Sequence, residues 1–147
     1  MADFEPGSRF QPVLSDPVAN PALVERIVFV SGKIYYDLVK QRQSIGLNDR
    51  VAFIRIEELS PFPFHELRDT LQAYTSAKQF VWLQEEPRNQ GAWTHVATRL
   101  GAVLAGLGHH TGVVYKGRKE ASVPAPGVAS VYAVQQKEVL AGAFRDV

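Results

Sequence analysis

Short apolar runs alternate with amphipathic stretches along most of this chain. Residues 27–30 and 80–83 are continuous apolar runs, and residues 51–56 are nearly so. Such runs predict strands that are covered on both faces, as in parallel sheets flanked by helices. Residues 33–42 and 64–74 place apolar side chains at helical spacing, which predicts helices. The alternation predicts an α/β domain of three layers with a largely parallel sheet.

The central unit of the chain is the run at residues 80–83 with the segment that follows it. The polar residues 84–86 mark the place where the chain leaves the sheet, Pro87 is expected to end the strand, and Asn89 is expected to cap the next helix. Apolar side chains then recur at helical spacing as far as Leu107. In open α/β sheets, ligands and partners bind at the carboxyl ends of strands, so we expect function at this turn.

The two ends of the chain give weaker patterns. Residues 113–115 are expected to form a fourth strand, residues 129–133 a fifth, and residues 135–144 a closing helix. The proline-rich residues 1–24 show little periodicity, which predicts an extended linker arm rather than a folded element. The folded domain is therefore expected to cover residues 25–147.

Composition limits the classes of function. The 147 residues are 46% hydrophobic, which suits one globular domain with its own core. The net charge of +1 comes from 16 basic and 15 acidic residues spread along the chain, which argues against nucleic acid or an anionic membrane as a partner. The chain has no cysteine, so disulfides, thiolate metal sites and a cysteine nucleophile are excluded. The opening residues resemble neither a signal peptide nor a presequence, and we interpret the start as an internal one.

Two pairs of glutamates follow predicted strands, Glu57 with Glu58 and Glu85 with Glu86. Neighbouring side chains on extended backbone diverge, so neither pair is expected to act on one substrate atom as acid and base. We expect a protein interface or a structural role for them instead. Trp93, at the predicted helix start, belongs to the core or, if it is exposed, anchors that interface. Parallel strands would align these residues along one edge of the sheet, facing a protein partner.

Four further residues are candidates for binding an anion. Ser31 and Gly32 form a turn before a predicted helix, where free N–H groups and Lys33 suit an anion, although a plain tight turn is the simpler interpretation. Ser31 also lacks the surroundings of a nucleophile elbow. Arg118 has a forked donor that fits a carboxylate or phosphate, or else an ion pair with a strand-end glutamate.

Other chemistry has little support in the sequence. The histidines are not spaced as metal ligands, and we expect them to be exposed to solvent; they are His65, His95, His109 and His110. Neither a dinucleotide-binding glycine motif nor a Walker motif is present. Trp82 lies inside the central strand and is expected in the core.

Five segments in order carry a resemblance to a known family. They are FEPGSRFQPV, VFVSGKIYYDLVKQR, RIEELSPFPFHEL, WLQEEPRNQGAW and YKGRKEASVPAPG. Together they resemble the C-terminal domain of the thiamine diphosphate-dependent decarboxylating component of 2-oxoglutarate dehydrogenase, including its 2-oxoadipate-type relatives. The resemblance covers residues 4–144 and implies a fold like the C-terminal domain of transketolase.

The resemblance also implies a division of labour. In that family other domains hold thiamine diphosphate and magnesium, so no catalytic, cofactor or metal residue is expected here. The domain is implied to support dimer packing and access to the active site, and in some bacterial relatives to form part of an adenine-nucleotide or acetyl-CoA effector pocket, for which Arg118 is the anion contact that we carry over. Relatives often have a histidine where Tyr132 stands, so the role of that histidine is not carried over.

The implied partners are the rest of the same polypeptide, a homodimer partner and the lipoyl-bearing acyltransferase of the complex. The implied location is the mitochondrial matrix in a eukaryote or the cytoplasm in a bacterium. Three functions stay open at this stage. The first is oxidative decarboxylation of 2-oxoglutarate in the tricarboxylic acid cycle, the second is the same role for 2-oxoadipate in lysine degradation, and the third is a non-catalytic interaction or effector-binding module.

Overall fold

A five-stranded sheet forms the centre of the computed structural model, which describes residues 5, 7–18 and 20–147. Its strands are β1 (Val13–Ser15), β2 (Arg26–Val30), β3 (Val51–Ile56), β4 (Gln79–Pro87) and β5 (Val114–Arg118), in the order β1-β3-β2-β4-β5. Strands β2 to β5 pair in parallel, and β1 pairs antiparallel with β3. The predicted largely parallel sheet is confirmed.

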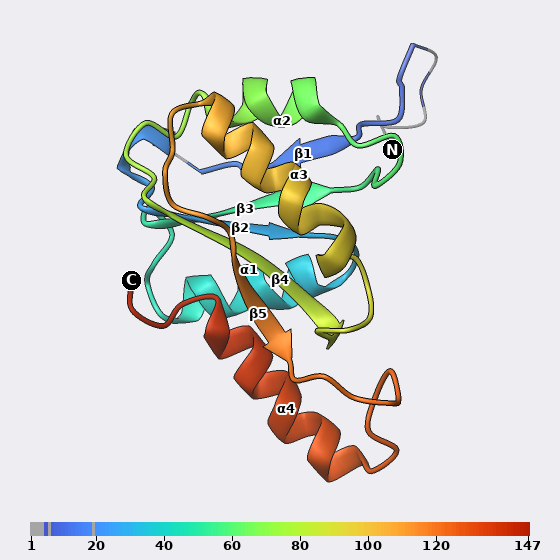
Figure 1. Cartoon of the computed structure of the whole chain (residues 1–147). Helices are drawn as coiled ribbons and strands as arrows, with labels where there is room; N and C mark the ends of the chain where they lie inside the picture. The colour runs from blue at the N-terminus through green and yellow to red at the C-terminus, as the bar shows by residue number, and fades with distance from the viewer. Residues whose placement is uncertain (1–4, 6, 19) are drawn as a thin grey trace.

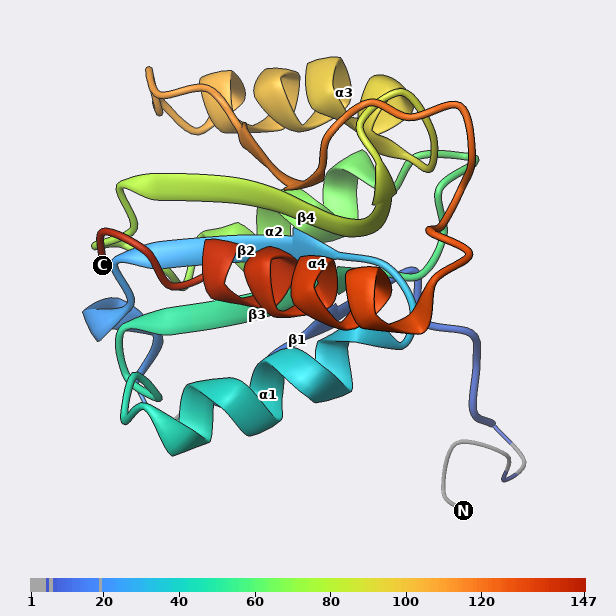
Figure 2. The same ribbon diagram turned by 90° about the horizontal axis from the view of Figure 1, so that it is seen from below.

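Helices cover both faces of the sheet, as Figures 1 and 2 show. They are α1 (Ile34–Ser44), α2 (Phe64–Leu71), α3 (Trp93–Gly106) and α4 (Ala129–Gly142), with a short 3₁₀ helix (Pro21–Leu23) before β2. Helices α2 and α3 contribute to the apolar cluster on one face, and α1 and α4 to the cluster on the other. The predicted three-layer α/β fold is therefore confirmed. Among the described residues, none of the helices combines the length and apolar character needed to span a membrane.

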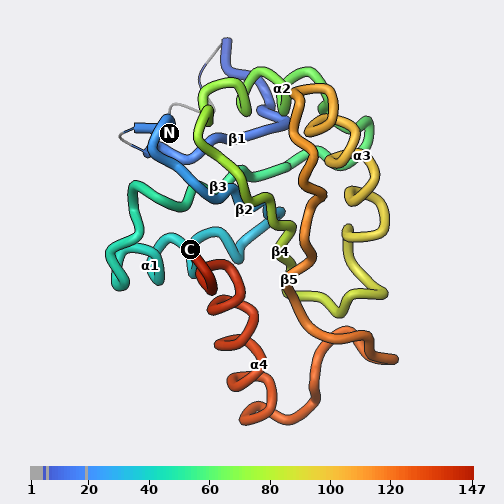
Figure 3. The backbone as a smooth tube through the Cα atoms, turned by 60° about the vertical axis from the view of Figure 1, so that its left-hand side comes forward, coloured from blue at the N-terminus to red at the C-terminus, as the bar shows by residue number. Residues whose placement is uncertain are grey.

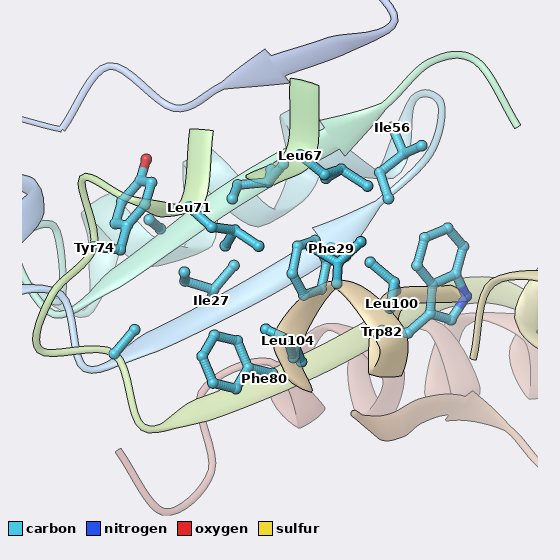
Figure 4. Packing of buried hydrophobic residues seen from close by; sticks show 14 of the residues in the cluster. Ile27, Phe29, Ile56, Leu67, Leu71, Tyr74, Phe80, Trp82, Leu100 and Leu104 are labelled. Carbon is cyan, nitrogen blue, oxygen red and sulfur yellow. The ribbon is translucent and has the colours of Figure 1, made fainter. Parts of the chain in front are cut away.

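The core explains why the central strands are apolar along their whole length. All five residues of β2 are buried, because Ile27 and Phe29 face α2 and α3 while Val28 faces α1 and α4. Figure 4 shows the larger cluster, in which Trp82 of β4 lies beside Leu100 of α3. Trp82 is only 1% exposed, so its predicted place in the core is confirmed.

The order of the strands creates a switch point at the carboxyl ends of β2 and β4. The chain leaves β2 through α1 toward β3, and it leaves β4 through α3, on the opposite face, toward β5. Since β2 and β4 are neighbours, their connections diverge and leave a crevice between them. Ligands of open α/β sheets bind at such points.

The segment after the central strand differs from its prediction. Strand β4 continues as far as Pro87, which pairs with Arg118, although the register is irregular after Leu83. Asn89 does not cap α3, which begins at Trp93. Its side chain instead exchanges hydrogen bonds of 3.0 and 3.1 Å with the backbone of Ala121. The turn is therefore held by a loop distant in sequence, which a local capping signal does not reveal.

The predicted fifth strand at residues 129–133 is wrong, because these residues are the start of α4. The β-branched and aromatic residues there suggested a strand. Helical spacing decides the structure, since Tyr132 and Gln136 meet the end of β4 while Val139 and Ala143 are buried on the same side of the helix. Tyr132 is consequently a helix residue. The first turns of α4 project beyond the end of β5 (Figures 1 and 3).

The predicted linker arm contains a folded element. Residues 1–4, 6 and 19 of the arm lie outside the described residues, but β1 adds an edge strand to the sheet next to β3. Asp16 then forms a buried ion pair with Arg42 of α1, and its Oδ2 accepts a hydrogen bond of 3.0 Å from the Phe53 backbone. The expectation of no folded element is wrong for this part, because a buried charge pair fixes the segment where periodicity is too short to show it.

Candidate functional site

The carboxyl edge of the sheet brings together most of the residues that the sequence singled out. Parallel pairing places the ends of β2, β3, β4 and β5 at the same edge. The side chains there divide between the two faces of the sheet. Glu85 lies with α1 and α4, whereas Gln84 and Glu86 line a cavity beside α3. The divergence expected of adjacent glutamates is therefore present.

Glu85 is the centre of a polar network on the α1 and α4 face. Its Oε1 accepts a hydrogen bond of 3.0 Å from Gln136 and lies 3.3 Å from Lys33 Nζ and 3.5 Å from the Tyr132 hydroxyl. The hydrogen bond to Glu85 raises the pKa of Lys33 above its ordinary value. The ammonium group of Lys33 is thus engaged by Glu85.

Arg118 fastens α4 to the end of the sheet. Its Nε donates to Gln135 Oε1 at 3.1 Å, one terminal nitrogen donates to Gln136 Oε1 at 2.8 Å, and the other donates to the Glu85 backbone oxygen. The guanidinium carbon also lies 4.8 Å from the centre of the Tyr132 ring. Arg118 is 8% exposed, and its contact with Glu85 is to the backbone, so the alternative ion pair with a strand-end carboxylate is not formed.

The other glutamate pair lies against the N-terminal arm. The backbone N–H groups of Glu57 and Glu58 both donate to Pro12 O, at 2.8 and 3.2 Å. The Glu57 carboxylate lies 3.8 Å from Arg55, whose guanidinium stacks over the ring of Tyr35. Both glutamates are half-buried. This pair therefore takes part in holding β1 and its flanking residues to β3.

Gln84 organises the turn between β4 and α3, and the sequence analysis missed this role. The side chain is 4% exposed, and its Oε1 accepts from Trp82 Nε1 at 2.9 Å and from the Trp93 backbone at 3.0 Å. Its Nε2 donates to Gln90 O at 2.7 Å and to Pro87 O at 3.0 Å. The spacing of two residues from Trp82 was an available signal, because it places both side chains on one face of the strand.

A cavity of about 540 Å³ opens at the switch point. We call it the switch-point pocket, and it is lined by Ser31, Gly32, Leu59, Ser60, Trp82, Gln84, Glu86, Gly91, Ala92 and His95. His95 Nε2 lies 2.8 Å from the Leu59 carbonyl oxygen, so it carries the proton of that hydrogen bond. Glu86 is exposed, and the described residues offer its carboxylate no partner. A free carboxylate thus stands at the pocket.

The four anion candidates do not share one site. Ser31 and Gly32 line the switch-point pocket, and Lys33 is paired with Glu85. Arg118 lines a different cavity, of about 710 Å³, between β5, the following loop and α4. Arg118 and the Ser31–Gly32 turn are thus in separate surroundings.

Trp93 is half-buried and packs on Tyr115, with ring centres 5.3 Å apart. The Tyr115 hydroxyl lies 2.8 Å from Arg118 O and 3.1 Å from Glu86 O. Burial raises the pKa of Tyr115 to about 12. Trp93 is therefore part of the wall between β4, β5 and α3, with one side left accessible.

The histidines are exposed only in part. His65 and His110 are exposed as expected. His95 is half-buried and hydrogen-bonded, and the His109 ring packs 4.7 Å from that of Phe80, so the expectation is wrong for these two. Within the described part of the chain, histidine, aspartate and glutamate do not gather in groups of three or more that suit a metal ion.

Comparison with known proteins identifies the family. Residues 1–144 match the family model described as 2-oxoglutarate dehydrogenase C-terminal. The chain is 42% identical over 145 residues to the 2-oxoglutarate dehydrogenase E1 component of Azotobacter vinelandii and 38% identical over 145 residues to the 2-oxoadipate dehydrogenase complex component E1 of Danio rerio. In both comparisons 98% of this chain aligns with 15% of the relative.

A solved structure described as a split gene transketolase, inactive beta4 tetramer, shares the fold. Its TM-score is 0.60 at 16% identity, over 95% of this chain and 43% of that one. This likeness supports the transketolase-like architecture alone. On the evidence of the family model and the E1 relatives, the chain belongs to the 2-oxoglutarate dehydrogenase C-terminal family, whose relatives include E1 components for 2-oxoglutarate and 2-oxoadipate.

Proposed function

We propose that this chain serves as the C-terminal domain of a thiamine diphosphate-dependent 2-oxoglutarate dehydrogenase, where it supports dimer assembly and access to the active site. The observation that carries the proposal is the family match over residues 1–144. Thiamine diphosphate and magnesium are held by other domains of the enzyme. The domain contributes shape and contact surfaces to oxidative decarboxylation.

The geometry of the carboxyl edge supports an assembly role. Glu85 and Arg118 are engaged in contacts that fix α4, and Gln84 is engaged in contacts that fix the turn before α3. Such groups stabilise a surface, whereas an acid or base must reach a substrate atom. The edge then faces the rest of the polypeptide or the second subunit, with Glu58, Glu86 and Trp93 as contact residues.

The partners follow from the same proposal. They are the rest of the polypeptide, a second copy of the enzyme and the lipoyl-bearing acyltransferase component that receives the acyl group. The enzyme works in the mitochondrial matrix in a eukaryote or in the cytoplasm of a bacterium, and relatives of both kinds are known, from Caenorhabditis elegans with a protein named as mitochondrial and from Azotobacter vinelandii.

A second candidate substrate is 2-oxoadipate. The E1 components for 2-oxoadipate of Danio rerio and Homo sapiens are 38% and 39% identical to the chain, which keeps this reaction in consideration. The 2-oxoglutarate enzymes of Azotobacter vinelandii and Caenorhabditis elegans lie in the same range, at 42% and 39% identity. A stand-alone interaction or effector-binding module is the alternative from another functional class.

A chimeric enzyme tests the proposal. The matching C-terminal part of the Azotobacter vinelandii E1 component is replaced by this chain, and the enzyme lacking that part is the control. We expect the chimera to assemble and to decarboxylate 2-oxoglutarate, while the truncated control loses both properties. The chain alone should neither bind thiamine diphosphate nor turn over substrate. A truncated control that is as active and as dimeric as the chimera would refute an assembly role and favour the stand-alone module.

A further inference from the structure

The strand-end glutamates differ in how their charges are compensated. Glu85 has Lys33 and Gln136 beside it, and Glu57 has Arg55. Glu86 has an exposed side chain without a described partner, and it is the one of these glutamates that lines the switch-point pocket. Among the pocket's described lining residues, Glu86 is the acidic one, and none is lysine or arginine. The pocket therefore has a negative wall.

The remaining polar groups of the pocket add acceptors to that charge. Since His95 Nε2 donates to Leu59 O, neutral His95 presents Nδ1 as an acceptor. The Ser31 and Ser60 hydroxyls, which can accept and donate, have no described hydrogen-bond partner. The first N–H of α3, which would attract an anion, is already bonded to Gln84 Oε1. This arrangement favours a cationic group with several N–H donors.

The shape of the pocket selects among cations. Leu59 and Ala92 give it apolar walls, which suit an aliphatic stem, and a volume of about 540 Å³ accommodates a long side chain. A guanidinium group spreads five donors in a plane and can bind a carboxylate with two of them, while an ammonium group acts as a point charge. We propose that the switch-point pocket receives an arginine side chain of a protein partner, with Glu86 as its counter-ion.

This inference rests on the proposed function, because it names the chemistry of the partner at the assembly edge. A single exposed arginine–glutamate contact contributes little by itself, because water and salt screen it. In an interface the same contact is partly desolvated, and its geometry then contributes to the choice of partner. The arginine therefore acts as one specific contact within a larger surface.

Titration of the 147-residue chain tests the pocket directly. Amide chemical shifts are followed while Nα-acetyl-arginine amide is added up to 100 mM, and the neutral isostere Nα-acetyl-citrulline amide is the control probe. We expect saturable shifts at Ser31, Ser60 and His95 with the arginine probe and none with citrulline. Glu86→Gln should weaken binding about threefold, the size expected of an exposed charge pair. Glu85→Gln, the same charge change on the opposite face, should leave the pocket shifts unchanged.

Several results would overturn the proposal. These are shifts of equal size with citrulline, an unchanged affinity in Glu86→Gln, or no saturable shift at the pocket up to 100 mM. Equal affinity for Nα-acetyl-lysine amide would overturn the choice of arginine.

The chimeric enzyme then tests the source of the group. Glu86→Gln should raise the dissociation constant of its assembly at least fivefold, and Glu86→Asp should recover part of that loss. Asp49→Asn, the same charge change in the exposed turn before β3, should serve as the control. An unchanged constant would overturn a protein arginine. Failure of the unmodified chimera to assemble would refute the proposed function. The titration of the isolated chain tests arginine binding at the pocket independently of assembly.

Discussion

Replacing Gln84 by methionine removes the amide that holds the turn between β4 and α3. Methionine keeps the length of the side chain and fills the same buried space, but it cannot pair with the groups around it. The indole Nε1 of Trp82 and the backbone N–H of Trp93 each lose their acceptor. The carbonyl oxygens of Gln90 and Pro87 lose a donor. The variant therefore isolates hydrogen bonding from packing volume.

The expected loss follows from the groups left unpaired. Trp82 is 1% exposed, so its N–H cannot turn to water, and a buried donor without a partner costs about 1 to 3 kcal/mol. The Trp93 N–H and the Gln90 carbonyl lie nearer the surface, where water replaces part of each bond, and the Pro87 carbonyl keeps the Gln90 N–H as a donor. Together these groups add about 1 kcal/mol. We expect Gln84→Met to lower the free energy of unfolding by about 2 to 4 kcal/mol.

Urea unfolding followed by far-ultraviolet circular dichroism measures this loss. Gln43→Met, at an exposed position of α1, is the matched control and should change stability by less than about 0.5 kcal/mol. In a Trp82→Phe background, which lacks the indole donor, Gln84→Met should cost about 1 kcal/mol less than in the native chain. A loss below about 0.5 kcal/mol, or no coupling with Trp82, would refute the assignment of Gln84 as the organiser of the turn.

Three further changes test other parts of the structure. Gly91→Ala should destabilise the chain by at least about 1 kcal/mol more than Gly46→Ala in the same urea assay. Both glycines have positive φ, but a Cβ at Gly91 would lie 2.9 Å from Gln84 Nε2, whereas a Cβ at Gly46 would meet open space. Equal losses would contradict the close contact at Gly91. Asp16→Ala should cost about 3 to 5 kcal/mol by leaving buried Arg42 unpaired. Glu25→Ala, which breaks the exposed pair with Arg50, should cost far less, and similar losses in the two variants would show that Asp16 does not fix the arm. Tyr115 has a pKa of about 12 in the folded chain, above the ordinary value of about 10, so its contribution to stability is complete below pH 10 and is lost as the pH rises toward 12. Subtracting the ultraviolet titration of Tyr115→Phe from that of the native chain should isolate one ionisation near pH 12, and an ionisation near pH 10 would contradict the burial of that hydroxyl.

The central strands could be predicted because both of their faces are buried. Strand β3 covers Val51–Ile56, the span expected from the apolar run alone, and β2 differs from its prediction by one residue. An apolar run that is determined by burial alone can be read correctly from the sequence. The start of α4 has two competing causes. Its valines and tyrosine favour a strand, and its attachment depends on Arg118 and Glu85, which the sequence does not place next to it.

The candidate site was predictable in position but not in its contacts. The end of β4 could be identified, because a polar turn follows a buried strand, and adjacent glutamates on extended backbone had to diverge. The partners of each group could not be identified. The partners of Gln84 come from the turn that it holds, and those of Glu85 come from α1 and α4, which lie far away in sequence.

The alternation of side chains at the end of β4 divides the edge into two parts with different uses. Glu85 and Arg118 hold α4, whose first turns reach beyond the sheet, so a change in either residue acts on the position of that helix. Gln84 and Glu86 face the switch-point pocket, where Gln84 fixes the shape and Glu86 supplies the charge. The two parts are joined through backbone groups, those of β4 and the carbonyl oxygens of Glu86 and Arg118 that contact the Tyr115 hydroxyl. A substitution on one face should therefore leave the other intact, which is why the two adjacent glutamates serve as each other's control.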